Sequence, residues 1–203
     1  MRDRFAEMRY DVFSHAHKMW EAGLVVGSSG NVSARVADDP SLIAITPTSI
    51  IYDEMAAQQI VVVDLLTGNS VESKGEPSYE LPMHRAIYRE MPNVSAIVHT
   101  HSPFVTTLSV LRKSLPPVID EMRMRFGGTI EVADYAPSGT EDLGRNAVRA
   151  LGNRPAAILA NHGNVCVAGD ASTALQIAIF MEAAARVYVQ ALQIGEPSVV
   201  RQK

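Results

Sequence analysis

The sequence lacks several features on which whole classes of protein depend. Cys166 is the single cysteine in 203 residues, so no disulfide can form within one chain. The formal net charge is −4, which leaves no broad basic surface to bind nucleic acid or an anionic membrane. No apolar run approaches the roughly 20 residues needed to span a bilayer. The segment 1–7 is too charged for a secretory signal peptide, so we expect a cytoplasmic protein without nucleic-acid or membrane partners.

What the sequence does contain is enough apolar material for one substantial core. Hydrophobic residues make up 47% of the chain, and its length predicts a single domain over residues 1–203. Apolar residues at three- and four-residue spacing predict helices over 5–20 and 171–192. Ser78 and Thr140 are expected to be the N-caps of two further helices. The β-rich or buried runs predict strands at 42–46, 60–64, 93–99, 129–133 and 156–160, so the pattern favours an α/β domain with a central sheet.

Two histidines one residue apart mark a candidate metal site. His99 and His101 lie at the end of a predicted strand, where residues two apart share a face with Cα atoms about 6.6 Å apart. Both imidazoles could therefore bind one ion, at about 2.0–2.1 Å each. The pair alone also fits a plainer arrangement, in which one ring is bonded to a carbonyl and the other is solvated.

A third histidine strengthens the metal hypothesis. His162 lies between a buried strand and Gly163, in a turn at a strand end, which is the same kind of location as His101. Two ligands from one strand and a third from a neighbouring strand end would leave positions open for water or substrate, an arrangement that suits catalysis. His84 follows Glu80 by four residues and could share a helical face with it, but we interpret His84 as a structural residue that supports the site. Glu80 alone could equally be a surface group that stabilises a helix dipole.

The order of several short motifs resembles the class II aldolase/adducin family. The matching elements run nearly from end to end of the chain: Gly30-Asn-Val-Ser33, Ile45-Thr-Pro-Thr-Ser49, Glu76-Pro-Ser-Tyr-Glu80, His84, His99-Thr-His101 and Asn161-His-Gly163. The resemblance implies a three-layer α/β/α fold with a central, mainly antiparallel sheet. It also implies a homotetramer with active sites between subunits.

The resemblance assigns roles to individual residues. It implies that His99, His101 and His162 bind a divalent metal, zinc foremost, with Mn²⁺, Co²⁺ and Fe²⁺ as alternatives. It also implies that Glu80 is the acid/base carboxylate, able to bind the metal and to swing away when substrate arrives. The substrate or its phosphate would contact Gly30, Asn31, Thr48, Ser49, Ser78 and Tyr79. Without the resemblance, the small-residue loop 27–33 could be an anion site or an ordinary turn.

The implied activity is that of a metal-dependent lyase of carbohydrate metabolism. Such an aldolase cleaves or forms a C–C bond in a small hydroxylated carbonyl compound or sugar phosphate through a metal-stabilised enediolate, with Glu80 moving the proton. A decarboxylase, epimerase or dehydratase on the same metal site is the alternative. An epimerase is less favoured, since matching family members tend to carry aspartate where Glu80 stands. The complete set of three histidines and Glu80 argues against a non-catalytic adducin-like module.

The sequence departs from the aldolase pattern at three places that touch the substrate. Ser49 stands where the sugar-phosphate aldolase usually has glycine, and Tyr79 stands where it has a second serine. The segment after Pro117 lacks the tyrosine that acts as a proton donor from a neighbouring subunit. Charged residues of the same segment could reach a neighbouring site instead, or could form a solvated helix face: Asp120, Glu121, Arg123 and Arg125.

Overall fold

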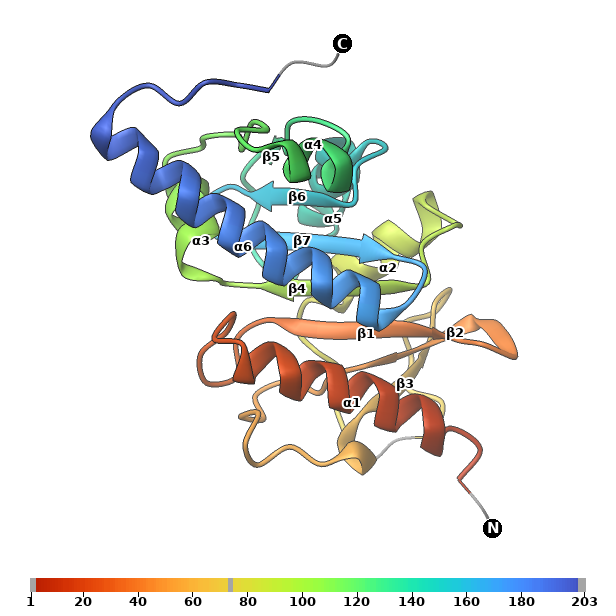
Figure 1. Ribbon diagram of the computed structural model, residues 1–203. Coiled ribbons are helices and arrows are strands. Elements are labelled where there is room, and N and C mark those ends of the chain that lie inside the picture. Colours follow the sequence, from red (N-terminus) through yellow and green to blue (C-terminus); the bar gives the residue numbers. More distant parts are fainter. Residues whose placement is uncertain (1–2, 73–74, 201–203) are drawn as a thin grey trace.

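The structure is a computed structural model that describes residues 3–72 and 75–200 (Figure 1). Its centre is a seven-stranded sheet in the order β3-β2-β1-β4-β7-β6-β5. The strands are β1 (Asn31–Val36), β2 (Asp39–Ile45), β3 (Val61–Asp64), β4 (Ala96–Thr100), β5 (Val132–Ala133), β6 (Ala156–Leu159) and β7 (Gly163–Ala168). Neighbouring strands are antiparallel except β5 and β6, which are parallel, so the expected mainly antiparallel sheet is confirmed.

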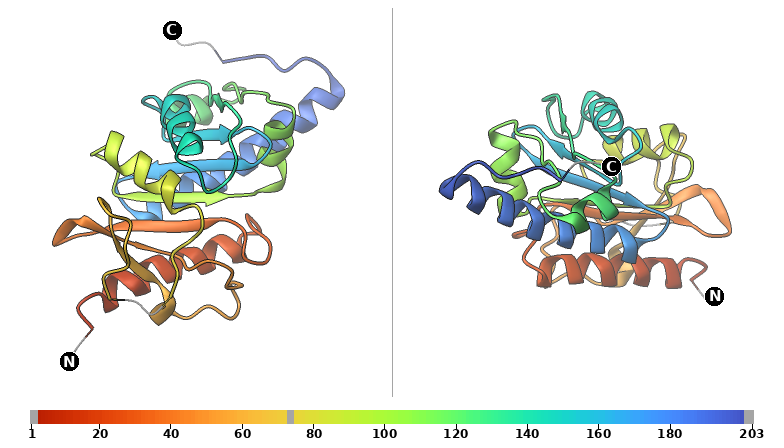
Figure 2. Two further views of the ribbon diagram at one scale, coloured as in Figure 1. Left: turned by 180° about the vertical axis from the view of Figure 1, so that it is seen from behind. Right: turned by 45° about the horizontal axis from the view of Figure 1, so that its top comes forward.

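Helices cover both faces of this sheet, which confirms the three-layer arrangement (Figure 2). One hydrophobic core lies between the sheet and α1 (Ala6–Glu21), α3 (Pro103–Val110), α4 (Asp120–Phe126) and α6 (Ala171–Ile194). The other lies between the sheet and α2 (Leu81–Glu90) and α5 (Glu141–Leu151). A short 3₁₀ helix, η1 (Ala57–Gln59), precedes β3.

The alternation of side chains along the central strands decides which face carries the candidate site. On β4, Ala96 and Val98 belong to the core beneath α1 and α6, whereas Ile97 belongs to the core beneath α2 and α5. His99 is two residues beyond Ile97, so its ring lies on the α2 and α5 face. On β1, which pairs with β4, Asn31 also points to that face, because Val32 belongs to the other core.

The expected start of α2 is wrong. The helix begins at Leu81, and its N-cap is Glu80 rather than Ser78. The Ser78 backbone N–H donates to the carbonyl of Thr46 at 2.9 Å, which keeps this segment extended beside the end of β2. The expected cap at Thr140 is confirmed, because its side chain accepts from the Leu143 N–H.

Strand β1 was not predicted. Polar Asn31, Ser33 and Arg35 alternate with apolar residues, so the segment shows no apolar run, and the small residues of 27–33 indicate a loop. These polar side chains have buried partners on α2 and on the chain around it. Tertiary contacts therefore satisfy the hydrogen bonds of these polar side chains, although the sequence of the segment resembles that of a turn.

Helix α6 corrects the expectation that the chain holds no segment long and apolar enough to cross a membrane. It has 24 residues and a mean hydropathy of 1.3 over its most apolar 18-residue window, and by length and composition it meets that criterion. Eight of its residues are buried, and the helix packs against β4, β7, α1 and α3. Core helices of soluble proteins meet the same criterion, so the finding is weak evidence for a membrane.

Candidate metal centre

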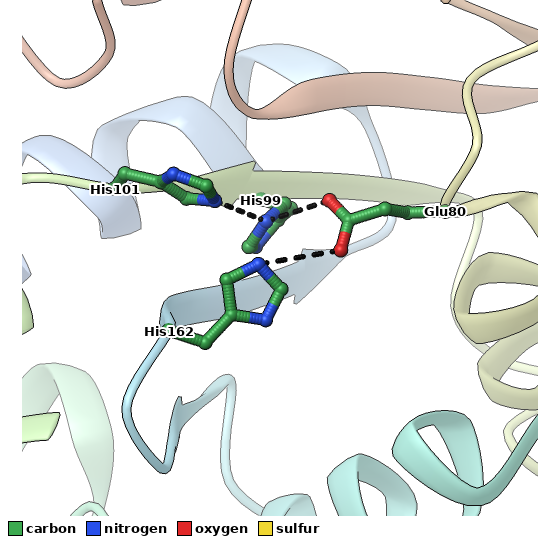
Figure 3. Close-up of side chains that lie close together, drawn as sticks. All are labelled: Glu80, His99, His101 and His162. Carbon is green, nitrogen blue, oxygen red and sulfur yellow. Dashed lines mark hydrogen bonds and ion pairs between the residues drawn. The ribbon is translucent and has the colours of Figure 1, made fainter. Parts of the chain in front are cut away.

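Four side chains converge at the ends of β4 and β7 (Figure 3). Glu80, His99, His101 and His162 each offer one ligand atom, and these atoms all lie within 4.8 Å of one another. The three imidazole centroids are 4.8 Å apart in every pair, with interplanar angles of 69° to 71°. The rings therefore approach a common point from three directions, and the carboxylate closes the group from the fourth.

The neighbouring strands bring these residues together. His99 is in β4 and His101 lies just beyond its end, while His162 is in the tight turn between β6 and β7. Because β4 pairs with β7 in the register Thr100↔Asn164, that turn lies beside the end of β4. A Cβ on Gly163 would lie 2.2 Å from the Thr100 carbonyl oxygen. Only glycine allows the turn to approach this closely.

The atoms that face the centre are the ring nitrogens and carboxylate oxygens expected of metal ligands. His99 Nε2 is 2.9 Å from Glu80 Oε2 and 2.9 Å from His101 Nε2. His162 Nε2 is 3.3 Å from Glu80 Oε1. His99 Nδ1 is 2.8 Å from the carbonyl oxygen of Asn164, which can only accept, so Nδ1–H donates and Nε2 faces the centre.

The charges of these groups depend on burial and on each other. Burial opposes ionisation of Glu80, but the charges of His99 and His162 and the bonds from His99 and Ser138 hold the pKa of its carboxyl well below the usual value. Burial would lower the pKa of His99, and the facing Glu80 carboxylate instead raises it. Burial and the charge of His99 lower the pKa of His101 to about 3 and that of His162 to about 4. These two imidazoles are therefore neutral at pH 7, the state in which imidazole binds metals.

The donor set fits a divalent metal. Three imidazole nitrogens and one carboxylate suit zinc and neighbouring transition metals better than magnesium or calcium, which prefer oxygen ligands. The buried Asn164 carbonyl orients His99, an arrangement common around metal-binding histidines. The residues of this site are therefore able to hold such an ion.

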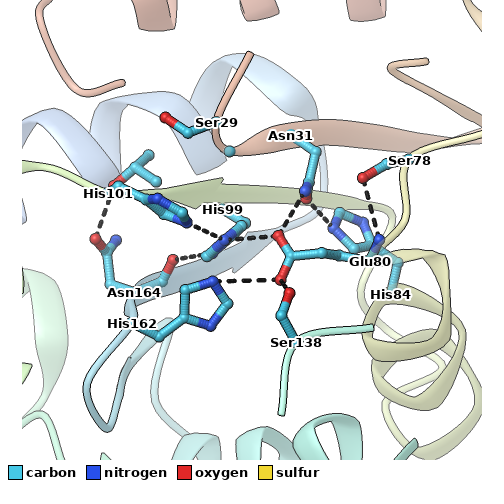
Figure 4. Close-up of polar contacts among 12 residues, drawn as sticks. Ser29, Asn31, Ser78, Glu80, His84, His99, His101, Ser138, His162 and Asn164 are labelled. Carbon is cyan, nitrogen blue, oxygen red and sulfur yellow. Dashed lines mark hydrogen bonds and ion pairs between the residues drawn. The ribbon is translucent and has the colours of Figure 1, made fainter. Parts of the chain in front are cut away.

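Asn31 and Ser138 both donate hydrogen bonds to Glu80, but only Asn31 could be predicted from the sequence (Figure 4). Ser138 Oγ donates to Glu80 Oε1 at 2.7 Å, and Asn31 Nδ2 donates to Glu80 Oε2 at 2.9 Å. Asn31 was a candidate because of its motif, but Ser138 carried no signal, since it lies 58 residues away in a short loop before α5. His84, interpreted as a supporting residue, contacts the other end of the Asn31 carboxamide.

The segments expected to bind phosphate lie side by side. The Thr48 N–H donates to the Glu76 carbonyl at 3.1 Å, and the Thr46 N–H donates to the Val32 carbonyl at 3.0 Å. The loops that carry Gly30, Thr48 and Ser78 therefore meet where β1 begins and β2 ends, beside the candidate metal centre.

The structure places three of the candidate substrate residues in distinctive settings. Ser49 has a backbone φ of 59°, a left-handed conformation that favours glycine, so the backbone here keeps the form that a glycine would adopt. The Asn31 side chain is buried against Glu80 and His84. Tyr79 is 68% exposed, and its ring packs on Gly139.

The charged residues after Pro117 pair with one another on α4. Arg123 contacts Asp120 at 3.0 Å, and Arg125 contacts Glu121 at 2.7 Å, all at the surface. Within one chain these side chains form the solvated helix face that was one of the two expectations.

The fold and this donor set define a metal-dependent enzyme of the class II aldolase type. The family described as "Class II Aldolase and Adducin N-terminal domain" matches residues 11–189, and the chain belongs to this family. It is 34% identical to the 5-deoxy-D-ribulose 1-phosphate aldolase of Bacillus thuringiensis serovar kurstaki, over 95% of this chain and 89% of that protein. It is 35% identical to the L-fuculose phosphate aldolase of Escherichia coli K12, over 89% and 81%. A solved structure of an L-fuculose 1-phosphate aldolase superposes with a TM-score of 0.91 and 35% identity, over 97% of this chain and 91% of that one.

Proposed function

We propose that this aldolase cleaves and forms a C–C bond in a small ketose 1-phosphate. The observation that carries the proposal is the convergence of Glu80 with three histidines, next to the loops that carry Gly30, Thr48 and Ser78. Relatives of about one third identity over most of the chain are named for a fuculose phosphate and a deoxyribulose phosphate, both sugar phosphates. We propose zinc as the resident metal, His99, His101 and His162 as its ligands, and Glu80 as a fourth in the resting enzyme.

The side chains of the site suit this chemistry. A divalent metal held there would act as a Lewis acid toward the carbonyl and hydroxyl oxygens of the substrate. Glu80 is buried, and its lowered pKa keeps the carboxylate ionised, which is the form that a general base requires. In the bond-forming direction Glu80 takes the proton from the carbon beside the carbonyl, and in cleavage it returns the proton to that carbon.

The proposed binding site for the substrate phosphate is formed by the loops that carry Gly30, Thr48 and Ser78. We propose that the backbone around Gly30 and the hydroxyls of Thr48, Ser49 and Ser78 bind it, with Asn31 and Tyr79 at the margin. The left-handed backbone at Ser49 supports this, because it keeps the loop shape of a glycine-bearing phosphate site. We also propose that the protein is a homotetramer. A cytoplasmic location is proposed as well, in keeping with a single, buried cysteine.

The test is a substrate screen with purified, metal-loaded protein. We expect cleavage of phosphorylated ketoses, including fuculose 1-phosphate and 5-deoxyribulose 1-phosphate, and little cleavage of the unphosphorylated sugars or of 2-keto acids. Released dihydroxyacetone phosphate is measured with a coupled reductase. Metal content by elemental analysis and mass by light scattering test zinc and the tetramer. Failure to cleave any ketose phosphate with metal bound would contradict the proposal.

Glu80→Gln is the matched variant for the acid/base role. It keeps the size of the side chain and all three imidazoles but removes the carboxylate that accepts the proton. We expect a folded protein whose kcat falls by about 10²–10⁴-fold, the usual range for loss of general acid–base catalysis. A variant with full activity would exclude Glu80 from proton transfer.

A further inference from the structure

A buried chain of hydrogen bonds leads to Glu80 along the face of α2 that packs on the sheet. Tyr88 Oη lies 2.8 Å from Ser33 Oγ, which lies 2.6 Å from His84 Nδ1. His84 Nε2 lies 2.5 Å from Asn31 Oδ1, and Asn31 Nδ2 lies 2.9 Å from Glu80 Oε2. The part next to the metal centre is drawn in Figure 4. The other four members of this hydrogen-bonded chain are at most 2% exposed, so water does not compete for these bonds: Tyr88, Ser33, His84 and Asn31.

The directions of the bonds in this chain follow from the ionised Glu80 at its end and from the single proton on the His84 ring. An ionised Glu80 can only accept, so Asn31 must present its NH₂ group to the carboxylate. The Asn31 carbonyl oxygen then faces His84, and His84 Nε2 must donate to it. Burial lowers the pKa of His84 to about 3, so the ring carries one proton, and Nδ1 must accept from the Ser33 hydroxyl. Ser33 in turn accepts from Tyr88.

We infer that His84 is a positioning residue for the acid/base carboxylate. Its neutral ring, protonated on Nε2, fixes the Asn31 carboxamide so that NH₂ rather than oxygen faces Glu80. Ser138 holds the other carboxylate oxygen from the opposite side, so each oxygen of Glu80 has a donor besides the histidines of the metal centre. The inference deepens the proposed function, since it assigns a role within the same site.

The alternative arrangements explain why His84 matters. If the ring carried its proton on Nδ1, two acceptors would face each other at Nε2 and Asn31 Oδ1. If the Asn31 amide were reversed, its oxygen would face the carboxylate and repel it. A buried acceptor left without a donor is destabilising, so the observed arrangement is favoured over both. The direction of the donor reaching Glu80 is therefore set by an imidazole that bonds to Asn31 and not to the carboxylate itself.

The first test measures the tautomer and needs neither metal nor substrate. A long-range ¹H–¹⁵N correlation spectrum of the metal-free, ¹⁵N-labelled protein at pH 7.5 reports which imidazole nitrogens carry protons. The His84 signals are assigned by their loss in His84→Gln. We expect a protonated Nε2 and an unprotonated Nδ1. The opposite tautomer, or a ring protonated on both nitrogens, would overturn the inference whatever the enzyme's substrate proves to be.

The second test separates positioning from folding with two substitutions at the same residue. His84→Leu removes the donor to Asn31, whereas the terminal amide of His84→Gln can replace it. With the best ketose phosphate from the screen, we expect the leucine variant to lose about 10- to 100-fold in kcat while KM and metal content change little. The glutamine variant should recover most of that loss. A folded leucine variant with the wild-type kcat, or a glutamine variant no better than leucine, would overturn the inference.

A control within the same buried chain is Tyr88→Phe. It removes the last hydroxyl but leaves the bonds from Ser33 to His84 and from His84 to Asn31 in place. We expect a modest fall in thermal stability and a much smaller loss of kcat than in His84→Leu. Equal losses in the two variants would show that kcat follows general loosening of the core, which overturns the inference. If the leucine variant does not fold, the tautomer measurement still decides.

Discussion

The substitution Gly163→Ala should separate the proposed metal ligands without altering any of them. Gly163 follows His162 at the start of β7, and a Cβ there would lie 2.2 Å from the Thr100 carbonyl oxygen and 3.1 Å from His101 Cδ2. Real Cβ atoms essentially never approach another heavy atom within 3.0 Å. The turn must therefore move away from β4 by about 0.8 Å or more, which is the difference between the 3.0 Å limit and the 2.2 Å approach to the Thr100 oxygen.

This displacement is large compared with the tolerance of a metal site. Metal–ligand distances vary by only about 0.2 Å. A displacement of the turn by about 0.8 Å is four times this tolerance, so it carries His162 out of reach of an ion held by His99 and His101. We expect metal affinity to fall by about 10- to 100-fold, as when residues that orient metal ligands are replaced. Overpacking should also lower the free energy of unfolding of the metal-free protein by about 1–3 kcal/mol.

Calorimetric titration of the metal-stripped protein with Zn²⁺ measures the affinity, and thermal unfolding measures the stability. Gly169→Ala is the matched control, because Gly169 follows the other end of β7 and a Cβ there would meet nothing within 4 Å. The control should bind Zn²⁺ as the wild type does. Wild-type affinity in Gly163→Ala would refute the argument that this close approach sets the position of His162.

Three further predictions address metal binding, folding and pH. His99→Ala should lose most of the bound metal after desalting, measured by elemental analysis, and unchanged metal content and activity would exclude His99 as a ligand. Glu182→Ala should lower the free energy of unfolding, measured in urea, by about 1–2 kcal/mol. The reason is that the Glu182 carboxylate accepts from the Phe104 and Val105 N–H groups at the start of α3. An unchanged unfolding midpoint would contradict this. For His84 the pKa of 6.5 falls to about 3 on folding, so the unfolded chain gains its proton first as the pH falls. The stability of the metal-free wild type relative to His84→Gln should therefore drop by about 1.4 kcal/mol per pH unit between pH 6 and 4, and a constant difference would contradict a neutral, buried ring.

Local patterns in the sequence predicted much of the fold. The apolar spacing over 171–192 corresponds to α6, and the cap at Thr140 begins α5 as expected. These features depend on neighbours a few residues away, so periodicity and capping chemistry reveal them. Ser78 is not the N-cap because its N–H bond to Thr46, 32 residues earlier in the chain, holds this segment extended and the helix begins only at Leu81. A local rule cannot detect such a competitor.

The sequence by itself determined which residues could form the site: a histidine pair at a strand end, a third histidine before Gly163, and a glutamate in a matching motif. Only the tertiary structure decided how these groups are held. Ser138 and the carbonyl of Asn164 reach Glu80 and His99 from segments 58 and 65 residues away. Their hydrogen bonds depend on β4 pairing with β7 and on the close packing of α2 and α5, and a linear pattern does not encode such distances.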